Sequence, residues 1–519
     1  MRNYPIILCI TLVAGVNQAV LAQQALSTSL KQPISISLGD WEQDPRHQVR
    51  QPIQRVSHQP APSPSPSDLL PTPSVKPQDQ PTLMSFDCCT NRSQNCCNQG
   101  GQTCCTQPKA CQTCQTAPVC CETKCCEPQC GETKCCVPAN CCEEEESPFS
   151  FRGWLSGGIT YNPDKPLDRF NGPVTFNDRA NELMMNQFYL IAERAIEADG
   201  CNWDFGFRID TVFGTDSRFT KATGLEWNTA FAEEWNSQNR RFYQFALPQF
   251  YGEIALPVGA GLKAKIGHFY TIIGNEVVTA PDNFFYSHAY SHQYGEPFTH
   301  TGLLLSYPLG ENLTITGGVV HGWDNFWDNN DKPSIIGGFS ATSADEKSTL
   351  ALSFITGPEQ TGNNDNNRIM YSVVFSRQVT DNFRYIFQHD FGHDDNAVAA
   401  GVDAVWYGVN QYFLYTINEC WSAGLRLEWF RDDNGARVVT LNNATTTGPR
   451  TSPLPANPGL GVSYSAITAG LNWSPIDNLV IRPEARWDWS NASGGSYSPF
   501  NAGTSGSQFL LGTDVIYSF

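Results

Sequence analysis

The sequence predicts an all-β protein, a transmembrane antiparallel β-barrel of about sixteen strands preceded by a disordered Pro-rich and Cys-rich N-terminal segment. Three observations lead to this fold class. Segments of about ten to thirteen residues alternate between apolar and polar side chains. Tight turns alternate with long polar connections. The last residues, GTDVIYSF, form an alternating strand that stops at an aromatic side chain.

Residues 1–22, MRNYPIILCITLVAGVNQAVLA, have one arginine near the start, an apolar core from Ile6 to Val16 and small residues at the end. This pattern predicts a secretory signal peptide that is cleaved after Ala22. The apolar core is shorter than the roughly 20 residues that a membrane-spanning helix needs. The mature protein is therefore expected to be exported, which permits disulfides.

Residues 23–87 are rich in Pro, Gln and Ser and almost free of aromatic residues. Such a composition buries too little apolar surface to offset the entropy of ordering, so we expect a disordered spacer.

Residues 88–148 hold 17 of the 20 cysteines, many in adjacent pairs, and include an acidic run at 143–146. In an exported protein this favours a disulfide-stapled or intermolecularly cross-linked segment. Metal binding stays open as an alternative, although ordinary zinc-ribbon spacing is not met. Cys201 and Cys420 fall on predicted turns, where they could bond to each other or tether this segment.

Residues 149–519 carry the alternating pattern. In residues 478–490, Leu479, Trp487 and Trp489 share one face, while arginines and carboxylates occupy the other. A soluble β-sandwich would turn the apolar face inward. Three features favour a membrane barrel instead: the strand length matches the roughly 9–11 tilted residues that cross a bilayer, aromatic residues sit near strand ends, and the connections alternate in length.

The connections give the strand number. Seven tight turns are predicted at 198–202, 256–261, 308–312, 343–347, 379–382, 417–420 and 475–478. Eight long loops are predicted at 162–183, 214–240, 272–297, 323–334, 357–368, 392–402, 432–463 and 490–506. Together they join sixteen strands, and an even number with short turns on one side is the outer-membrane pattern.

The final strand is expected to pair with the first, at 153–161, because backbone groups in lipid must all be bonded within a closed sheet. Outer-membrane barrels as a class end on an aromatic residue that acts as an assembly signal. We therefore predict that role for Phe519 and Tyr517.

Three stretches carry a family resemblance: RIDTVFGTDS (208–217), GHFYTIIGNEVVTAPDNFFYSHAY (267–290) and EPFTHTGLLLSYP (296–308). From Phe151 to Phe519 the chain resembles the OmpL-like beta-barrel porins, a planctomycete-type outer-membrane porin family. The resemblance implies a channel in the bacterial outer membrane, in contact with its lipid. The Cys-rich segment lies outside the resemblance and is expected in the periplasm.

A sixteen-stranded barrel is wide enough to hold water, and its inward charges would filter solutes. Strand alternation predicts these pore-lining residues: Asp204, Arg208, Asp210, Lys263, Lys265, Arg384, Asp390, Arg426, Glu428, Arg482, Glu484, Arg486 and Asp488. A second interpretation is that some of these charges pair with one another and fill the wall.

The third long loop, 272–297, is rich in aromatic residues and is expected to narrow the pore, as the third loop does in general porins. The constriction candidates are Asp282, Asn283, Phe284, Phe285, Tyr286, His288 and His292. His288 and His292 could bind a metal if they shared a helical turn, but satisfied loop histidines are the preferred interpretation, so no metal and no cofactor are expected.

The leading functional hypothesis is passive diffusion of small hydrophilic solutes, without enzymatic activity. A structural barrel that links the Cys-rich segment to envelope proteins is a second hypothesis, and a barrel-embedded hydrolase is a third, although no GxSxG or HExxH motif is present. The net charge of -18 argues against nucleic acid as a partner. A homotrimer is common among sixteen-stranded porins, but nothing in the sequence specifies one.

Overall fold

The computed structural model describes residues 148–519, apart from 199, 201, 229–231, 234–241, 439–459 and 493–497. The predicted signal peptide, the Pro-rich spacer, nearly all of the Cys-rich segment and Cys201 lie outside the described residues. Within the described part of the chain, no helix is long and apolar enough to cross a membrane.

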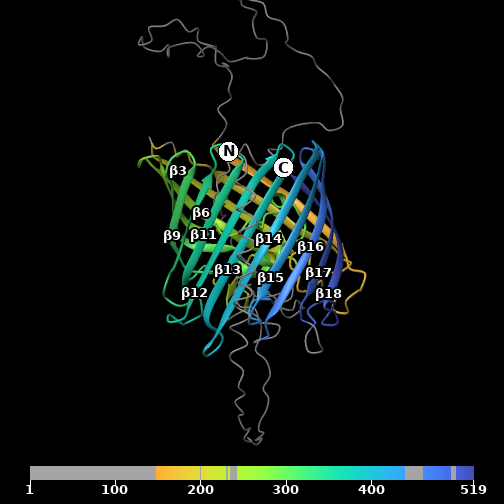
Figure 1. Cartoon of the computed structure of the whole chain (residues 1–519). Helices are drawn as coiled ribbons and strands as arrows, with labels where there is room; N and C mark the ends of the chain where they lie inside the picture. The colour runs from red at the N-terminus through yellow and green to blue at the C-terminus, as the bar shows by residue number, and fades with distance from the viewer. Residues whose placement is uncertain are drawn as a thin grey trace, which may run out of the picture. The chain divides into compact units, whose positions relative to one another are not determined.

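Sixteen antiparallel strands close into a barrel, which confirms the predicted fold class (Figure 1). The barrel strands are β1 Phe149–Tyr161, β2 Leu183–Arg194, β3 Asp204–Gly214, β6 Gln244–Leu256, β7 Leu262–Tyr270, β8 Thr299–Pro308, β9 Leu313–Val320, β10 Ser334–Thr342, β11 Ser348–Pro358, β12 Asn367–Thr380, β13 Phe383–Ala399, β14 Val402–Asn418, β15 Trp421–Asp432, β16 Val462–Ile476, β17 Leu479–Ser490 and β18 Ser507–Ser518. Two short strands outside the barrel, β4 Trp227–Asn228 and β5 Ala232–Glu233, pair with each other in the β3–β6 connection.

The barrel closes where β1 meets β18, as the sequence predicts. Their register runs from Trp154 opposite Ser518 to Tyr161 opposite Leu511. Beyond it, Gly153 and Phe519 exchange two backbone hydrogen bonds of 2.9 Å. The closure leaves no unpaired edge in the hydrocarbon layer, where an unbonded peptide group is costly.

The alternation of side chains is also confirmed. On β3, Phe205 is 59% exposed on the outer face, whereas Arg208 and Asp210 are buried on the inner face. The outer face carries aromatic pairs near both strand ends. The rings of Trp421 and Trp473 stack with centroids 5.5 Å apart near the short turns, and those of Trp487 and Trp489 lie 4.9 Å apart near the long loops.

The seven predicted tight turns all connect barrel strands, but one predicted long loop is wrong. Residues 392–402 extend β13 and β14 instead, and Ala399 pairs with Val402 across a two-residue turn that contains Gly401 with φ +76°. The sequence GHDDNAVAA has the polar composition of a loop. Its backbone nevertheless stays in the hairpin, with an irregular register between Asp394 and Ala399, because each strand provides the partner of the other.

We call the half of the interior next to the long connections the loop half, and the other half the short-turn half. Loops pack into the loop half and form a buried cluster with inward side chains from the wall. The cluster includes Tyr290 and Trp323 from loops and Leu304, Ile336, Ile355 and Met370 from β8, β10, β11 and β12. The walls of the loop half are therefore covered by packed side chains.

Candidate functional site

The connection between β7 and β8, residues 271–298, folds into the barrel and contains two short helical segments, η2 Ala280–Asp282 and η3 Ser291–Gly295 (Figure 1). Its polar contacts reach the inner faces of β13, β15 and β17. We call this connection the inner loop. It contains all the predicted constriction residues, 282–292.

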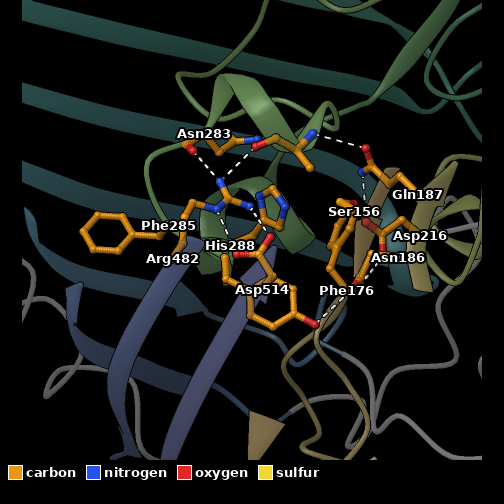
Figure 2. A pocket seen from close by; sticks show the side chains of 12 residues that line it. Ser156, Phe176, Asn186, Gln187, Asp216, Asn283, Phe285, His288, Arg482 and Asp514 are labelled. Atoms are coloured by element: carbon orange, nitrogen blue, oxygen red, sulfur yellow. Dashed lines mark hydrogen bonds and ion pairs between the residues drawn. The ribbon is translucent and has the colours of Figure 1, made fainter. Parts of the chain in front are cut away.

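Three arginines from the barrel wall hold the backbone of the inner loop. Arg426 on β15 donates to the carbonyl oxygen of Ser287 at 2.6 Å. On β17, Arg486 donates to the carbonyl of His288 at 3.1 Å, and Arg482 donates to that of Ala280 at 2.9 Å. Figure 2 shows Arg482 between Asp514 and the loop. A guanidinium has five donors in a fixed plane, so each arginine can bind a wall carboxylate and a loop carbonyl together.

Wall carboxylates accept hydrogen bonds from backbone N–H groups of the inner loop. Glu484 accepts the N–H groups of Tyr286 and Ser287 at 3.0 and 3.1 Å. Glu428 accepts the N–H group of Tyr290 at 3.0 Å. These N–H groups belong to the stretch between the two helical segments, where a buried peptide group needs such a partner because leaving it unpaired is costly. The inward charges of β15 and β17 thus supply the hydrogen bonds that let this loop lie inside the barrel.

Glu276 of the inner loop is the centre of one network. One of its oxygens accepts from Arg426 at 2.8 Å and from the Tyr412 hydroxyl at 3.0 Å. The other lies 3.2 Å from Nδ1 of His288 and accepts the N–H of Ala289 at 2.8 Å. Burial alone would raise the pKa of Glu276, but Arg426 and His288 favour the ionised form and hold that pKa below its ordinary value.

Aromatic rings of the inner loop lie where the wall has glycines. A Cβ on Gly424 would lie 2.3 Å from the ring of Phe284, and one on Gly470 would lie 3.2 Å from the ring of Phe285. Both wall positions face inward, so the missing side chains leave room for the rings. The fit combines apolar ring packing with the polar bonds to the arginines.

The first long connection, 162–182, covers the inner loop from another side. The ring of Phe176 lies 4.3 Å from that of His288, between centroids. Tyr294 donates its hydroxyl hydrogen to the carbonyl of Pro173. Further along, Arg218 in the short segment η1 Asp216–Arg218 binds both oxygens of Asp178 at 2.8 and 2.9 Å. Several loops therefore form one packed body inside the barrel.

A small polar cavity remains between the inner loop and the wall formed by β1, β2, β17 and β18 (Figure 2). Among the residues that line it are Ser156, Asn186, Asp216, Arg482 and Asp514. Asp216 accepts from Asn186 and Gln187 at 2.9 Å each. Burial raises the pKa of Asp216 above its ordinary value.

Comparison with protein-family models now identifies the chain. Residues 148–519 match the family described as "Putative beta-barrel porin-2, OmpL-like". The chain belongs to this family of porins. The match covers the whole barrel, and it confirms the family resemblance that the sequence stretches indicate.

Solved structures similar to this porin include several outer-membrane channels. The outer membrane channel DcaP of Acinetobacter baumannii is 12% identical, with a TM-score of 0.45, and the match covers 72% of this chain and 97% of that one. An anion-selective porin from Comamonas acidovorans is 10% identical, with a TM-score of 0.44, and the match covers 72% of this chain and 99% of that one. OprB of Pseudomonas putida is 12% identical, with a TM-score of 0.44, and the match covers 72% of this chain and 94% of that one. No curated protein sequence matches significantly.

Most of the predicted pore-lining residues of this porin are buried and paired. Arg208 lies 3.1 Å from Asp210, Lys265 lies 3.4 Å from Glu253, and Asp204 accepts from Arg194 at 2.9 Å. Arg426, Glu428, Arg482, Glu484, Arg486 and Asp488 form the contacts with the inner loop, directly or through one another. These pairs correspond to the second interpretation of the sequence, in which charges fill the wall.

The remaining predicted residues have different surroundings. Asp390 is buried and accepts from Gln388 at 2.7 Å, Arg384 donates to Ser376 at 2.9 Å, and Lys263 is exposed. Asp282 is the exposed member of the constriction set.

Sequence reasoning missed four charged partners, Glu276, Asp514, Glu253 and Arg194. A periodicity reading of β18 places Asp514 on the face opposite its aromatic residues, so that carboxylate could have been found. Glu276 lies on a loop, where side chains do not alternate between two faces, so the direction of its side chain cannot be predicted from the sequence.

Among the described residues, one group has atoms close enough to ligate a metal. His393, Asp395 and Asp403 offer ligand atoms within 4.8 Å of one another near the tip of the β13–β14 hairpin. The imidazole already lies between the two carboxylates, 3.6 Å from Asp395 and 3.3 Å from Asp403. These contacts account for the group without an ion.

Proposed function

We propose that this porin allows small hydrophilic solutes to diffuse passively across the outer membrane, and that the inner loop sets the width of the passage. One observation carries the proposal. The inner loop leaves the wall at β7 and is bound on the far side by Arg426, Arg482 and Arg486. A segment that spans the lumen in this way stands in the path of any solute.

The two halves of the interior differ in a way that supports this path. Inward side chains in the short-turn half, such as Ser306, Thr316 and Ser340, are partly exposed, so solvent reaches them from the short-turn side. In the loop half, inward side chains such as Ile336 and Met370 are fully buried. A solute that enters from the short-turn side therefore meets the inner loop and its packed neighbours, and passage requires the loop to shift.

The attachment of the loop permits such a shift. Its contacts with the wall are hydrogen bonds, ion pairs and ring packing between side chains or from side chain to backbone, whereas the wall itself is a continuous ladder of backbone bonds. Loop motions occur on faster timescales than opening of a sheet. The inner loop is thus the element of the lumen that can open without loss of the barrel.

Deletion of residues 282–294 tests the proposal. Single-channel conductance of the purified full-length protein in a planar bilayer should rise several-fold, because the deleted residues cross the lumen. Deletion of the equally long stretch 443–455, in the β15–β16 connection, provides the control. An unchanged conductance after the first deletion, with normal barrel assembly, would exclude the inner loop as the constriction.

We further propose that the Cys-rich segment links this porin to envelope proteins on the periplasmic side. The first strand begins at Phe149 on the short-turn side, which outer-membrane barrels direct to the periplasm. Cys420, in a short turn on that side, is disulfide-bonded. Reducing agent should release the porin from envelope complexes; complexes that resist reduction would contradict this role.

A homotrimer remains a proposal that cross-linking can test.

A further inference from the structure

The wall formed by β8, β9, β10 and β11 has a distinctive composition. These four consecutive strands contain no Asp, Glu, Lys or Arg. The inward charges predicted from the sequence come from β3, β7, β13, β15 and β17, which form the rest of the wall together with their neighbours. The barrel therefore has a charged side, to which the inner loop is bound, and an uncharged side.

The strand register shows what the uncharged side offers to the lumen. Ile336 on β10 is buried in the interior, opposite Gly318 of β9 and Ile355 of β11. Two residues further toward the short turns, Ser306 of β8 lies opposite Thr316 of β9, and their hydroxyl oxygens are 3.0 Å apart. The next inward position on β10 after Gly338 is Ser340.

Six inward hydroxyl side chains in this region are partly exposed: Ser306, Thr314, Thr316, Ser340, Thr342 and Thr349. We call them the hydroxyl strip. It lies between the buried apolar row and the short turns, so it lines the half of the lumen that solvent reaches. A hydroxyl group both donates and accepts hydrogen bonds. When a hydroxylated solute gives up a hydrogen bond to water, a serine or threonine hydroxyl can therefore take the place of that water.

Charges elsewhere on the wall are largely neutralised. Arg426 contacts two carboxylates at 2.8 Å each, and Arg482 binds Asp514 at 2.6 Å. Arg208 has a carboxylate partner at 3.1 Å. Lys263 on β7 lies opposite Ser306 of the hydroxyl strip, Arg384 on β13 lies beyond β12 on the other side, and exposed charges such as Glu311 and Asp345 lie in the adjoining short turns. At physiological salt the field of such accessible charges is screened within about 8 Å.

We propose that this porin passes small uncharged polyhydroxylated solutes, such as sugars, in preference to ions of equal size, and that the hydroxyl strip is the wall along which they travel. This inference rests on the proposed channel function. An ion that enters a narrow lumen loses hydration, and paired wall charges offer it little compensation. A sugar exchanges its water contacts for those of serine and threonine at small cost.

Uptake by proteoliposomes that contain the full-length protein tests the preference. Glucose and gluconate have nearly the same size and differ by one charge. We expect glucose to enter several-fold faster than gluconate. Equal or faster entry of gluconate would overturn the preference and leave the channel function standing. Entry of neither solute, nor of salt, would instead overturn the channel function on which the preference rests.

Ser340→Asp and Ser340→Asn test the hydroxyl strip itself, because the two new side chains have the same shape and differ in charge. In a potassium chloride gradient, Ser340→Asp should shift the zero-current potential toward potassium selectivity, whereas Ser340→Asn should leave it unchanged. Thr349→Asp and Thr349→Asn repeat the test at a second position if the first pair fails to assemble. Conducting Asp variants without a shift would show that solutes do not pass along the strip.

Discussion

At the residue scale, the charged side chains inside this barrel act mainly on one another and on the inner loop. Arg426 bridges Glu276 of the loop and Glu428 of the wall, with 2.8 Å to each. Isolated buried charges are very unfavourable, and pairing with full hydrogen bonding makes their burial tolerable. Such a network favours one position of the loop, and removal of a single partner leaves a buried charge without its full set of hydrogen bonds, which weakens that position.

Glu276→Gln should loosen the inner loop. The substitution leaves Arg426 with one carboxylate partner and weakens the contact with His288, and loss of one member of a buried pair typically costs about 3–5 kcal/mol. Since 1.4 kcal/mol corresponds to a factor of ten, even part of this cost should raise the open fraction of single channels at least tenfold. Asp345→Asn, in the exposed β10–β11 turn, is the matched control. An open fraction equal to that of the control variant would contradict the attachment role.

At the element scale, the strands can be predicted from the sequence, but their contacts with the inner loop cannot. The alternation in residues 478–490 predicts β17 and the inward side of Arg482 and Arg486, because strand geometry fixes faces. The bond between Tyr286 and Glu484 joins residues 198 positions apart, and no local pattern encodes that pairing. The wrong loop at 392–402 has a related cause, since backbone pairing with a neighbour overrides polar composition.

Gly424→Val tests the fit between the loop and the wall without changing a charge. A Cβ at Gly424 would lie 2.3 Å from the ring of Phe284, so valine should displace that ring and weaken the loop contact. We expect larger and more frequent conductance steps in planar bilayers. Gly317→Val is the control, because Gly317 is exposed on the outer face and a Cβ there would meet nothing within 4 Å. Identical conductance of the two variants would argue that the ring contact is irrelevant to passage.

At the scale of the whole molecule, the barrel has the polarity of a membrane protein. Its outer face presents side chains such as Phe205 and Trp487, which are 59% and 50% exposed, while charged residues fill the interior. In water such a surface would expose a large apolar area to solvent, which is unfavourable. In a bilayer it is solvated by hydrocarbon, with aromatic pairs near both ends of the strands. The channel function depends on this orientation, because reversed faces would leave no polar lumen.

Two arginine substitutions on β16 test that orientation. Ala469 is exposed on the outer face of β16, midway between two positions that pair with tryptophans of neighbouring strands. On one side Ser465 pairs with Trp489, and on the other side Trp473 pairs with Trp421. Ala469→Arg places a charge near the bilayer midplane and should lower the free energy of unfolding by about 2–4 kcal/mol in denaturant titrations in lipid vesicles. Asn472→Arg, on the inward face of the same strand near the short turns, should cost much less, because water reaches that half of the lumen. If Asn472→Arg proved the more destabilising of the two, the apolar face could not be the one in contact with lipid.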